Sequence, residues 1–231
     1  MRTFDPQKQI VYEDNHIIVV DKYPSQIVQG DKTGDEPLNE ALKKYLKVKY
    51  NKPGDVFLGV VHRLDRPTSG LVIFARTSKA LIRLNQMLQN HEIHKTYRAI
   101  VRKKKIEKTA KLTHHIYKNS KQNKSFVGKA GDKRTKKAIL DYVVIGESDS
   151  FFLLEITLHT GRHHQIRVQL SSIGLPIKGD IKYGYSRTNR DASISLNAHQ
   201  IEFIHPVKKT LVNIVSSVDL PDFTKLRFKK V

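Results

Sequence analysis

The sequence predicts an α+β fold with a mixed, mainly antiparallel sheet and a few flanking helices. Short apolar runs of strand length recur along the 231 residues, and most follow one another through short turns. Only three segments space their apolar residues as a helix does. Strands joined by short turns pair antiparallel, whereas parallel strands need long crossovers. The length allows one large domain with a sizeable core, and we expect residues 1–231 to form it.

The expected strands are rich in β-branched and aromatic side chains and are bounded by turn residues. A polar turn at 13–15 separates the first two, and another at 146–150 separates a later pair. The predicted strands cover residues 9–12, 16–21, 60–61, 71–75, 96–101, 139–145, 151–158, 200–204 and 211–215.

Helical spacing of apolar residues predicts three helices, which cover residues 38–46, 77–88 and 164–173. The second begins at Thr77 or Ser78, whose hydroxyl suits an N-cap. The third ends before Gly174, and glycine at this position readily takes the left-handed backbone that closes a helix.

The composition indicates the class of partner. Lys and Arg number 42 against 22 Asp and Glu, a net charge of +20, so we expect a polyanion, RNA before all others. A membrane surface is the weaker alternative, because no expected helix is apolar on one face and basic on the other. Cysteine is absent, which excludes disulfides and thiolate chemistry. Without a signal-like or membrane-spanning apolar run, we expect a cytoplasmic protein, monomeric until RNA binds.

The stretch 102–137 is the most basic part of the chain. Fourteen Lys and Arg residues face only Glu107 and Asp132, a local charge of +12. We interpret it as an RNA-gripping hairpin or finger, and the alternative is a solvated surface insertion. Its aromatics, Tyr117 and Phe126, are sparse, which favours phosphate contacts over base stacking. The lysines expected to contact phosphate are Lys103, Lys104 and Lys105.

One run places a carboxylate between two arginines: His62-Arg63-Leu64-Asp65-Arg66. The guanidinium groups favour the ionised acid. An ionised Asp that precedes a Thr-Ser-Gly turn and a buried strand suits a nucleophile or a charge stabiliser rather than a proton donor. Taken alone, the run is more typical of a surface salt-bridge cluster.

Residues 62–77 resemble the catalytic motif of the RluA-like family of RNA pseudouridine synthases. Further segments resemble the later motifs of this family in the same order, so the resemblance spans residues 10–218. These segments are Lys95-Thr96-Tyr97-Arg98-Ala99, residues 158–168 with the pattern Gly-Arg-x-His-Gln-Ile-Arg and their continuation at 174–184, and Leu196-Asn197-Ala198-His199 with 203–206.

The resemblance implies the isomerisation of uridine to pseudouridine in ribosomal or transfer RNA, with no metal and no cofactor. It implies a central catalytic cleft that splits the sheet, with Asp65 in its floor as the essential residue, acting at the sugar or at the ring. Tyr97 would stack on the uracil and is the candidate for the proton step. Arg167 would pair with the catalytic carboxylate.

The same resemblance suggests further contacts with RNA from Arg63, Arg66, Arg162 and His164. The chain departs from the family at two places: His163 stands where Thr is common, and residues 22–25 read Lys-Tyr-Pro-Ser instead of Lys-Pro-x-Gly. The small N-terminal RNA-binding module of many relatives is not expected, since the chain begins almost directly at the catalytic domain.

Three histidines, His159, His163 and His164, raise the alternative of a metal site. They lack a clear carboxylate partner, and adjacent side chains in a strand or helix point in different directions, so we expect no metal. Two other functions are kept as alternatives. A non-catalytic RNA-binding or ribosome-assembly protein would not need Asp65, and a metal-dependent nuclease would need a cluster of acidic ligands. The substrate uridine must leave its stack, which favours single-stranded loops and stem-loops.

Overall fold

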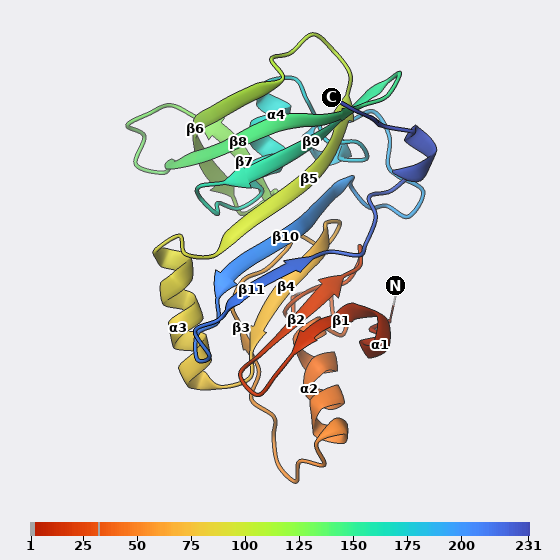
Figure 1. Ribbon diagram of the computed structural model, residues 1–231. Helices are drawn as coiled ribbons and strands as arrows, with labels where there is room; N and C mark the ends of the chain where they lie inside the picture. The colour runs from red at the N-terminus through yellow and green to blue at the C-terminus, as the bar shows by residue number, and fades with distance from the viewer. Residues whose placement is uncertain (1–2, 32) are drawn as a thin grey trace. The chain divides into compact units, whose positions relative to one another are not determined.

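The computed structural model describes residues 3–31 and 33–231. Within them it contains four α-helices and twelve strands (Figure 1), which confirms the α+β class with a mainly antiparallel sheet. Contacts divide the chain into two compact units. Unit 1 comprises Met1–His94 and Ala198–Val218, and unit 2 comprises Lys95–Asn197 and Asp219–Val231. The expectations of one domain and of a central cleft stay predictions.

Unit 1 is an antiparallel arrangement in which β1 pairs with β2, β2 and β3 pair with β4, and β10 pairs with β11. Its elements are α1 (Pro6–Gln9), β1 (Ile10–Glu13), β2 (Ile17–Lys22), α2 (Leu38–Lys49), β3 (Gly59–Val60), β4 (Ser69–Ala75), α3 (Ser78–Gln89), β10 (Leu196–Ile204, from Ala198 onward) and β11 (Leu211–Val215).

The central strands of unit 1 are β2 and β4, and every residue of both is buried. Successive side chains point to opposite faces of a strand, so each strand feeds two cores. Ile17 and Ile73 pack with Leu84 of α3. Ile18 and Phe74 pack on the other face, with the leucines of α2. Helices on both faces explain why the runs 17–20 and 71–75 are continuously apolar rather than alternating.

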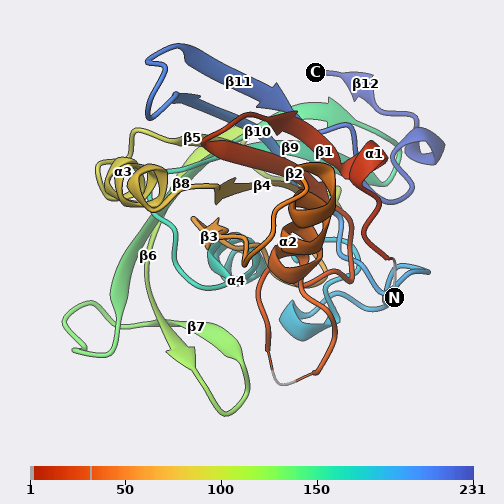
Figure 2. The same ribbon diagram turned by 90° about the horizontal axis from the view of Figure 1, so that it is seen from below.

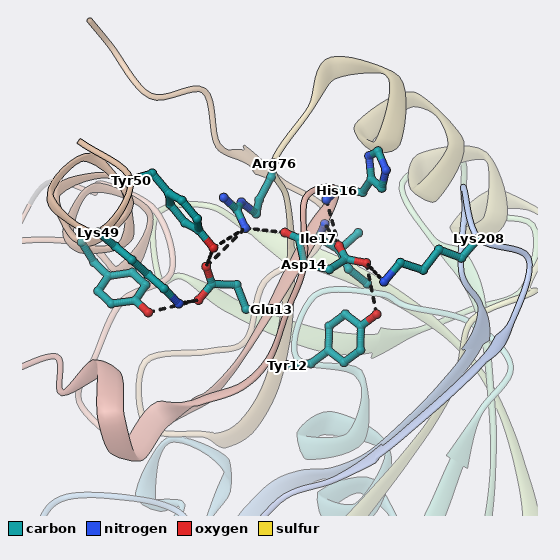
Figure 3. A network of polar contacts seen from close by, with 10 residues as sticks. Tyr12, Glu13, Asp14, His16, Ile17, Lys49, Tyr50, Arg76 and Lys208 are labelled. Carbon is teal, nitrogen blue, oxygen red and sulfur yellow. Dashed lines mark hydrogen bonds and ion pairs between the residues drawn. The ribbon is translucent and has the colours of Figure 1, made fainter. Parts of the chain in front are cut away.

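The turn between β1 and β2 is held by two carboxylates (Figure 3). Glu13 accepts hydrogen bonds from the Tyr50 hydroxyl at 2.6 Å and from Lys49 at 2.9 Å, and pairs with Arg76 at 3.2 Å. Asp14 lies 2.8 Å from the Nζ of Lys208. Burial opposes ionisation of Asp14, but the bonds from Lys208 and two backbone N–H groups outweigh it and hold its pKa below the ordinary value. Arg76 directly follows β4, so this network fixes the end of β4 that lies away from Asp65.

Unit 2 is an antiparallel sheet with the strand order β5-β9-β8-β6-β7, and β12 pairs with β8. Its elements are β5 (His94–Arg102, from Lys95 onward), β6 (Thr109–Asn119), β7 (Lys124–Gly128), β8 (Lys136–Glu147), β9 (Phe151–Leu158), α4 (Gln165–Ser172), two 3₁₀ turns (Ile181–Tyr183 and Thr224–Leu226) and β12 (Lys229–Lys230).

Helix α4 lies on one face of β6 and β8 (Figure 2), where Ile116, Ala138, Val168 and Tyr183 form a buried cluster. The Nε2 of Gln169 donates to the carbonyl of Ala138 at 3.2 Å and so joins the helix to the sheet. The basic stretch is therefore largely a β-hairpin, β6–β7, anchored on this helix.

The predicted strands and helices are present with shifted ends. Thr77 accepts a bond from the N–H of Ala80 at 3.1 Å, which confirms the expected N-cap of α3. Gly174 has φ +71°, and its N–H and that of Leu175 close α4 on the carbonyls of Ser171 and Leu170, as the glycine predicted. Strands β6 and β7 were not predicted individually, because the lysines on their exposed face hide the alternation. No helix in the described residues is long and apolar enough to span a membrane.

Candidate active site

Asp65 lies in the loop between β3 and β4 of unit 1, half-buried. Leu64 packs against the core cluster beside α2. The Asp65 carbonyl accepts the N–H of Thr68 at 3.0 Å and closes a turn. The Nε2 of His62 accepts the N–H of Ile73 at 3.2 Å, so the start of the motif is bonded to the strand that follows it. The loop is fixed at both ends, which limits the positions open to the carboxylate.

Gly70 explains the glycine of the Thr-Ser-Gly turn. Its φ of +110° is strained for any residue with a side chain. A Cβ atom there would lie 2.4 Å from the carbonyl oxygen of Ala198, a backbone atom that cannot move aside. Glycine therefore lets β4 start close against β10 directly after the motif.

Lys22, the last residue of β2, lies beside this loop and had no role in the sequence analysis. Its side chain is 0% exposed, and its Nζ donates to the carbonyl of Tyr23 at 3.0 Å and to that of Arg66 at 3.1 Å. Burial lowers the pKa of Lys22 to about 7, and the charge of the Asp65 carboxylate opposes this shift. A buried amine thus supports the backbone next to Asp65 and interacts electrostatically with its carboxylate.

The two arginines that flank Asp65 differ in their surroundings. Arg63 is exposed. Arg66 forms an ion pair with Asp35 at 2.5 Å, and its carbonyl accepts the N–H of Ser25 at 2.9 Å. Ser25 belongs to the segment that departs from the family pattern, and it has φ +76°, in the region that glycine prefers. This chain thus has serine in a left-handed backbone at the position where the family pattern has glycine.

Tyr97 lies on β5 of unit 2 opposite Ile156 of β9, and 7% of it is exposed. Alternation along the strand places it on the same face as Ala99 and Val101, both buried. The tyrosine therefore has a fixed ring position on this strand, which suits a stacking wall.

Arg167 forms a buried, two-pronged ion pair with Asp180. Its Nε donates to one carboxylate oxygen at 2.7 Å and its Nη2 to the other at 2.9 Å. Only 5% of Arg167 and 2% of Asp180 are exposed. The guanidinium carbon also lies 5.0 Å from the ring centroid of Tyr183. Asp180 and Tyr183 thus orient Arg167, a function that their place in a family motif did not reveal. Asp65 and Arg167 belong to different units, and their pairing stays a prediction.

The rings of His163 and His164 stack with centroids 3.7 Å apart. The expectation that adjacent histidines point in different directions was wrong here. His164 has φ +53°, a left-handed backbone at the start of α4 that breaks the alternation. His163 Nδ1 lies 2.8 Å from the hydroxyl of Ser125 on β7. The histidine that stands where the family commonly has Thr therefore connects the basic hairpin to the start of α4.

His164 is uncharged near neutral pH. Burial, followed by the charge of Arg167, lowers its pKa to about 2. The N–H of Ser125 donates to the Tyr183 hydroxyl at 2.8 Å, and this hydroxyl lies 2.9 Å from Nδ1 of His164. The hydroxyl proton is therefore best placed toward Nδ1, which leaves the proton of the neutral ring on Nε2.

The remaining residues predicted to contact RNA lie on the surface of unit 2. Lys103 pairs with Glu147, and Lys104 donates to the carbonyl of Ile173 at 3.0 Å, where it stabilises the C-terminus of α4. Lys105 is exposed. Arg162 is exposed and donates through Nε to the carbonyl of Lys137 at 3.2 Å. Two of the three lysines thus already have intramolecular partners. Among residues 3–31 and 33–231, no group of three or more histidine or acidic side chains is arranged to hold a metal.

Two solved structures share the fold of this chain. A human protein described as RNA pseudouridylate synthase domain containing 4 matches with a TM-score of 0.78 and 21% identity, over 96% of this chain and 94% of that chain. A second, described as RNA pseudouridylate synthase domain containing 1, matches with a TM-score of 0.75 and 24% identity, over 100% and 92%. At such low identity these likenesses show the fold, which is that of RNA pseudouridylate synthase domains.

The sequence comparisons show the family. Residues 16–172 match the model described as RNA pseudouridylate synthase. The chain is 34% identical to ribosomal large subunit pseudouridine synthase D of Zymomonas mobilis, over 96% of this chain and 72% of that protein. It is 31% identical to ribosomal large subunit pseudouridine synthase C of Buchnera aphidicola, over 92% and 68%. The chain belongs to the RNA pseudouridylate synthase family. It is an isomerase, and the resemblance found in its motifs is confirmed.

Proposed function

We propose that this enzyme converts uridine to pseudouridine in ribosomal RNA of the large subunit, with Asp65 as the catalytic carboxylate. The observation that carries the proposal is the Asp65 loop, which lies within the matched residues 16–172 and holds one acid between a buried lysine and a fully buried strand. The names of the two bacterial relatives support the choice of RNA.

The reaction breaks the bond between ribose C1′ and uracil N1 and forms a bond between C1′ and C5. The proton on C5 leaves and N1 gains one, so the product is an isomer and no redox partner is needed. The step requires an ionised carboxylate at the sugar or at the ring. Asp65 suits this role because its loop is fixed by Thr68 and His62 and because the buried amine of Lys22 interacts electrostatically with its carboxylate.

In this proposal Tyr97 stacks on the uracil while the base is detached, and its hydroxyl assists removal of the C5 proton. Arg167 interacts with the catalytic carboxylate, and Asp180 holds Arg167 in place for that contact. The buried positions of Tyr97 and Arg167 support these roles, because a fixed side chain loses little entropy when substrate binds. Arg63, Arg162 and His164 contact the RNA around the uridine, and the protein acts as a monomer.

In this proposal Arg66, Lys103 and Lys104 contribute less to RNA binding than the sequence suggested. Arg66, Lys103 and Lys104 each have a partner within the chain, which RNA would have to displace or share. Exposed Lys105 is the remaining member of the lysine run. We therefore place the principal phosphate contacts of the basic stretch further along it, on the β6–β7 hairpin.

The test is tritium release from RNA labelled at C5 of uridine, with Asp65→Asn as the variant. The amide keeps the shape of the carboxylate and removes its charge, so release should be abolished while RNA affinity stays near that of the wild type. The matched control is Asp55→Asn, an exposed aspartate of the same unit, which should release tritium normally. Normal release by Asp65→Asn would remove Asp65 from the chemistry. Mapping pseudouridine in cells with and without the protein identifies the RNA.

A further inference from the structure

Two aromatic side chains of the basic hairpin form one surface. Tyr117 of β6 lies directly opposite Phe126 of β7 in the antiparallel register. Their rings stack with centroids 5.8 Å apart and an interplanar angle of 26°. Both side chains are half-buried. In the sequence these aromatics are isolated, but the register joins them into a continuous pair.

The pair lies on the outer face of the hairpin. The neighbouring residues Ile116 and Ser125 point to the opposite face, where they are 3% and 2% exposed. Ile116 packs in the cluster with Val168 of α4, and the N–H of Ser125 bonds to the Tyr183 hydroxyl. Since side chains alternate along a strand, Tyr117 and Phe126 face away from α4.

Gly128 provides the space that the tyrosine ring occupies. A Cβ atom at this position would lie 3.2 Å from Cδ1 of Tyr117 and 2.7 Å from Cγ2 of Thr135. The contact with Thr135 is too short to exist and the contact with Tyr117 is tighter than usual, so a side chain here would shift Thr135 and press against the ring. The absence of a side chain at Gly128 therefore leaves room for the aromatic pair.

A cation lies at each end of the pair. The guanidinium carbon of Arg134 is 5.4 Å from the ring centroid of Tyr117, and the Nζ of Lys124 is 5.4 Å from that of Phe126. Asp132 holds Arg134 with Nη2 and a carboxylate oxygen 2.7 Å apart. Residues 117–137 contain eight Lys or Arg and one Asp, a local charge of +7. We call Lys124, Phe126, Tyr117 and Arg134 the hairpin platform.

We propose that the hairpin platform binds unpaired nucleotides of the RNA by stacking their bases on Tyr117 and Phe126, with the phosphates on Lys124 and Arg134. The inference rests on the proposed function and adds a contact outside the catalytic residues. Each base presents a π-face, so stacking needs no particular sequence. Paired bases are already stacked on their neighbours, so the platform selects single-stranded segments of the RNA. Acidic protein and anionic lipid satisfy the cations but leave the rings without a planar partner.

The experiment compares the affinity of the full chain for a short labelled oligouridylate and for a duplex RNA of equal length, by fluorescence anisotropy at one fixed salt concentration. The double variant Tyr117→Ala with Phe126→Ala should lose affinity for oligouridylate by roughly 5- to 150-fold, the worth of one stacked base. Its affinity for duplex should stay unchanged. The exchange Tyr117→Phe with Phe126→Tyr keeps both rings and should bind as the wild type does.

Two further controls separate stacking from charge and from general surface changes. Lys129→Ala with Lys133→Ala removes charge near the platform. This variant should bind both RNAs more weakly, and its affinity should depend less steeply on salt concentration. Phe57→Ala removes an aromatic side chain of unit 1 that is 48% exposed and should change neither affinity. The proposal is overturned if the double alanine variant loses affinity equally for both RNAs, or if it loses no affinity for oligouridylate.

A reporter observes stacking directly, even if the alanine variant folds poorly. The chain has no tryptophan, so Tyr117→Trp introduces a single indole at the platform. Oligouridylate should quench its fluorescence and duplex RNA should not. Quenching by anionic phospholipid vesicles, with none by oligouridylate, would assign the surface to a membrane and overturn the inference. Tritium release by the wild-type enzyme tests the proposed function separately: normal release without quenching by oligouridylate refutes the platform alone.

Discussion

The buried pair of Arg167 and Asp180 gives the sharpest prediction for stability. Asp180→Asn keeps the size of the side chain but removes the charge that accepts two N–H groups of Arg167, at 2.7 and 2.9 Å. Removing one partner of a buried ion pair costs about 3–5 kcal/mol. For a chain of this length, 1 kcal/mol lowers Tm by about 2–4 °C, so the expected loss is roughly 6–20 °C.

The chain contains a matched control for this variant. Asp132 holds Arg134 in the same two-pronged way, with distances of 2.7–3.3 Å, but 74% of the Arg134 side chain is exposed. Water replaces the lost contact at such a surface, so Asp132→Asn should leave Tm unchanged. Thermal unfolding followed by circular dichroism measures both variants.

A double variant tests the physical cause. Replacing both partners by apolar side chains, as in Arg167→Met with Asp180→Leu, removes the two buried charges together and should recover most of the lost stability. If Asp180→Asn unfolds at the same temperature as Asp132→Asn, or if the double variant is no better than Asp180→Asn, burial of the pair does not explain its contribution.

Further outcomes follow from the same residues. Tyr97→Phe should bind RNA normally and turn over roughly 10²–10⁴-fold more slowly in single-turnover assays, since it lacks only the hydroxyl; a rate within a few-fold of the wild type would leave Tyr97 as a stacking wall. His164 has a pKa of about 2 in the fold and an ordinary value of 6.5 in the unfolded chain, so the stability it contributes above pH 6.5 is lost as pH falls toward 2, by up to roughly 1.4 kcal/mol per pH unit. Urea unfolding of His164→Gln should show a smaller loss on acidification, and an identical pH profile would contradict this. Tritium release should survive EDTA with the RNA folded in monovalent salt, and a loss restored only by zinc or manganese would revive a metal site.

The sequence by itself determined the local structure. The continuous apolar run 71–75 identified β4 as a buried strand, because a strand covered on both faces needs apolar side chains on both of them. Thr77 and Gly174 marked helix ends, because capping depends only on atoms within one turn. The order of the motifs around Asp65, Tyr97 and Arg167 was also sufficient to indicate the family.

Other features of the sites were decided only by the tertiary structure. The choice of Asp180 as a partner of Arg167 depends on how the chain returns after α4, and the stacking of His163 on His164 depends on one left-handed residue. The pairing of Tyr117 with Phe126 depends on the register of a hairpin whose lysines conceal its pattern. Lys104 bonds to the end of α4 although its neighbours in sequence suggested phosphate. Periodicity along a chain reports which face a side chain occupies, but the atom it meets there is set by register, turn geometry and packing between segments distant in sequence.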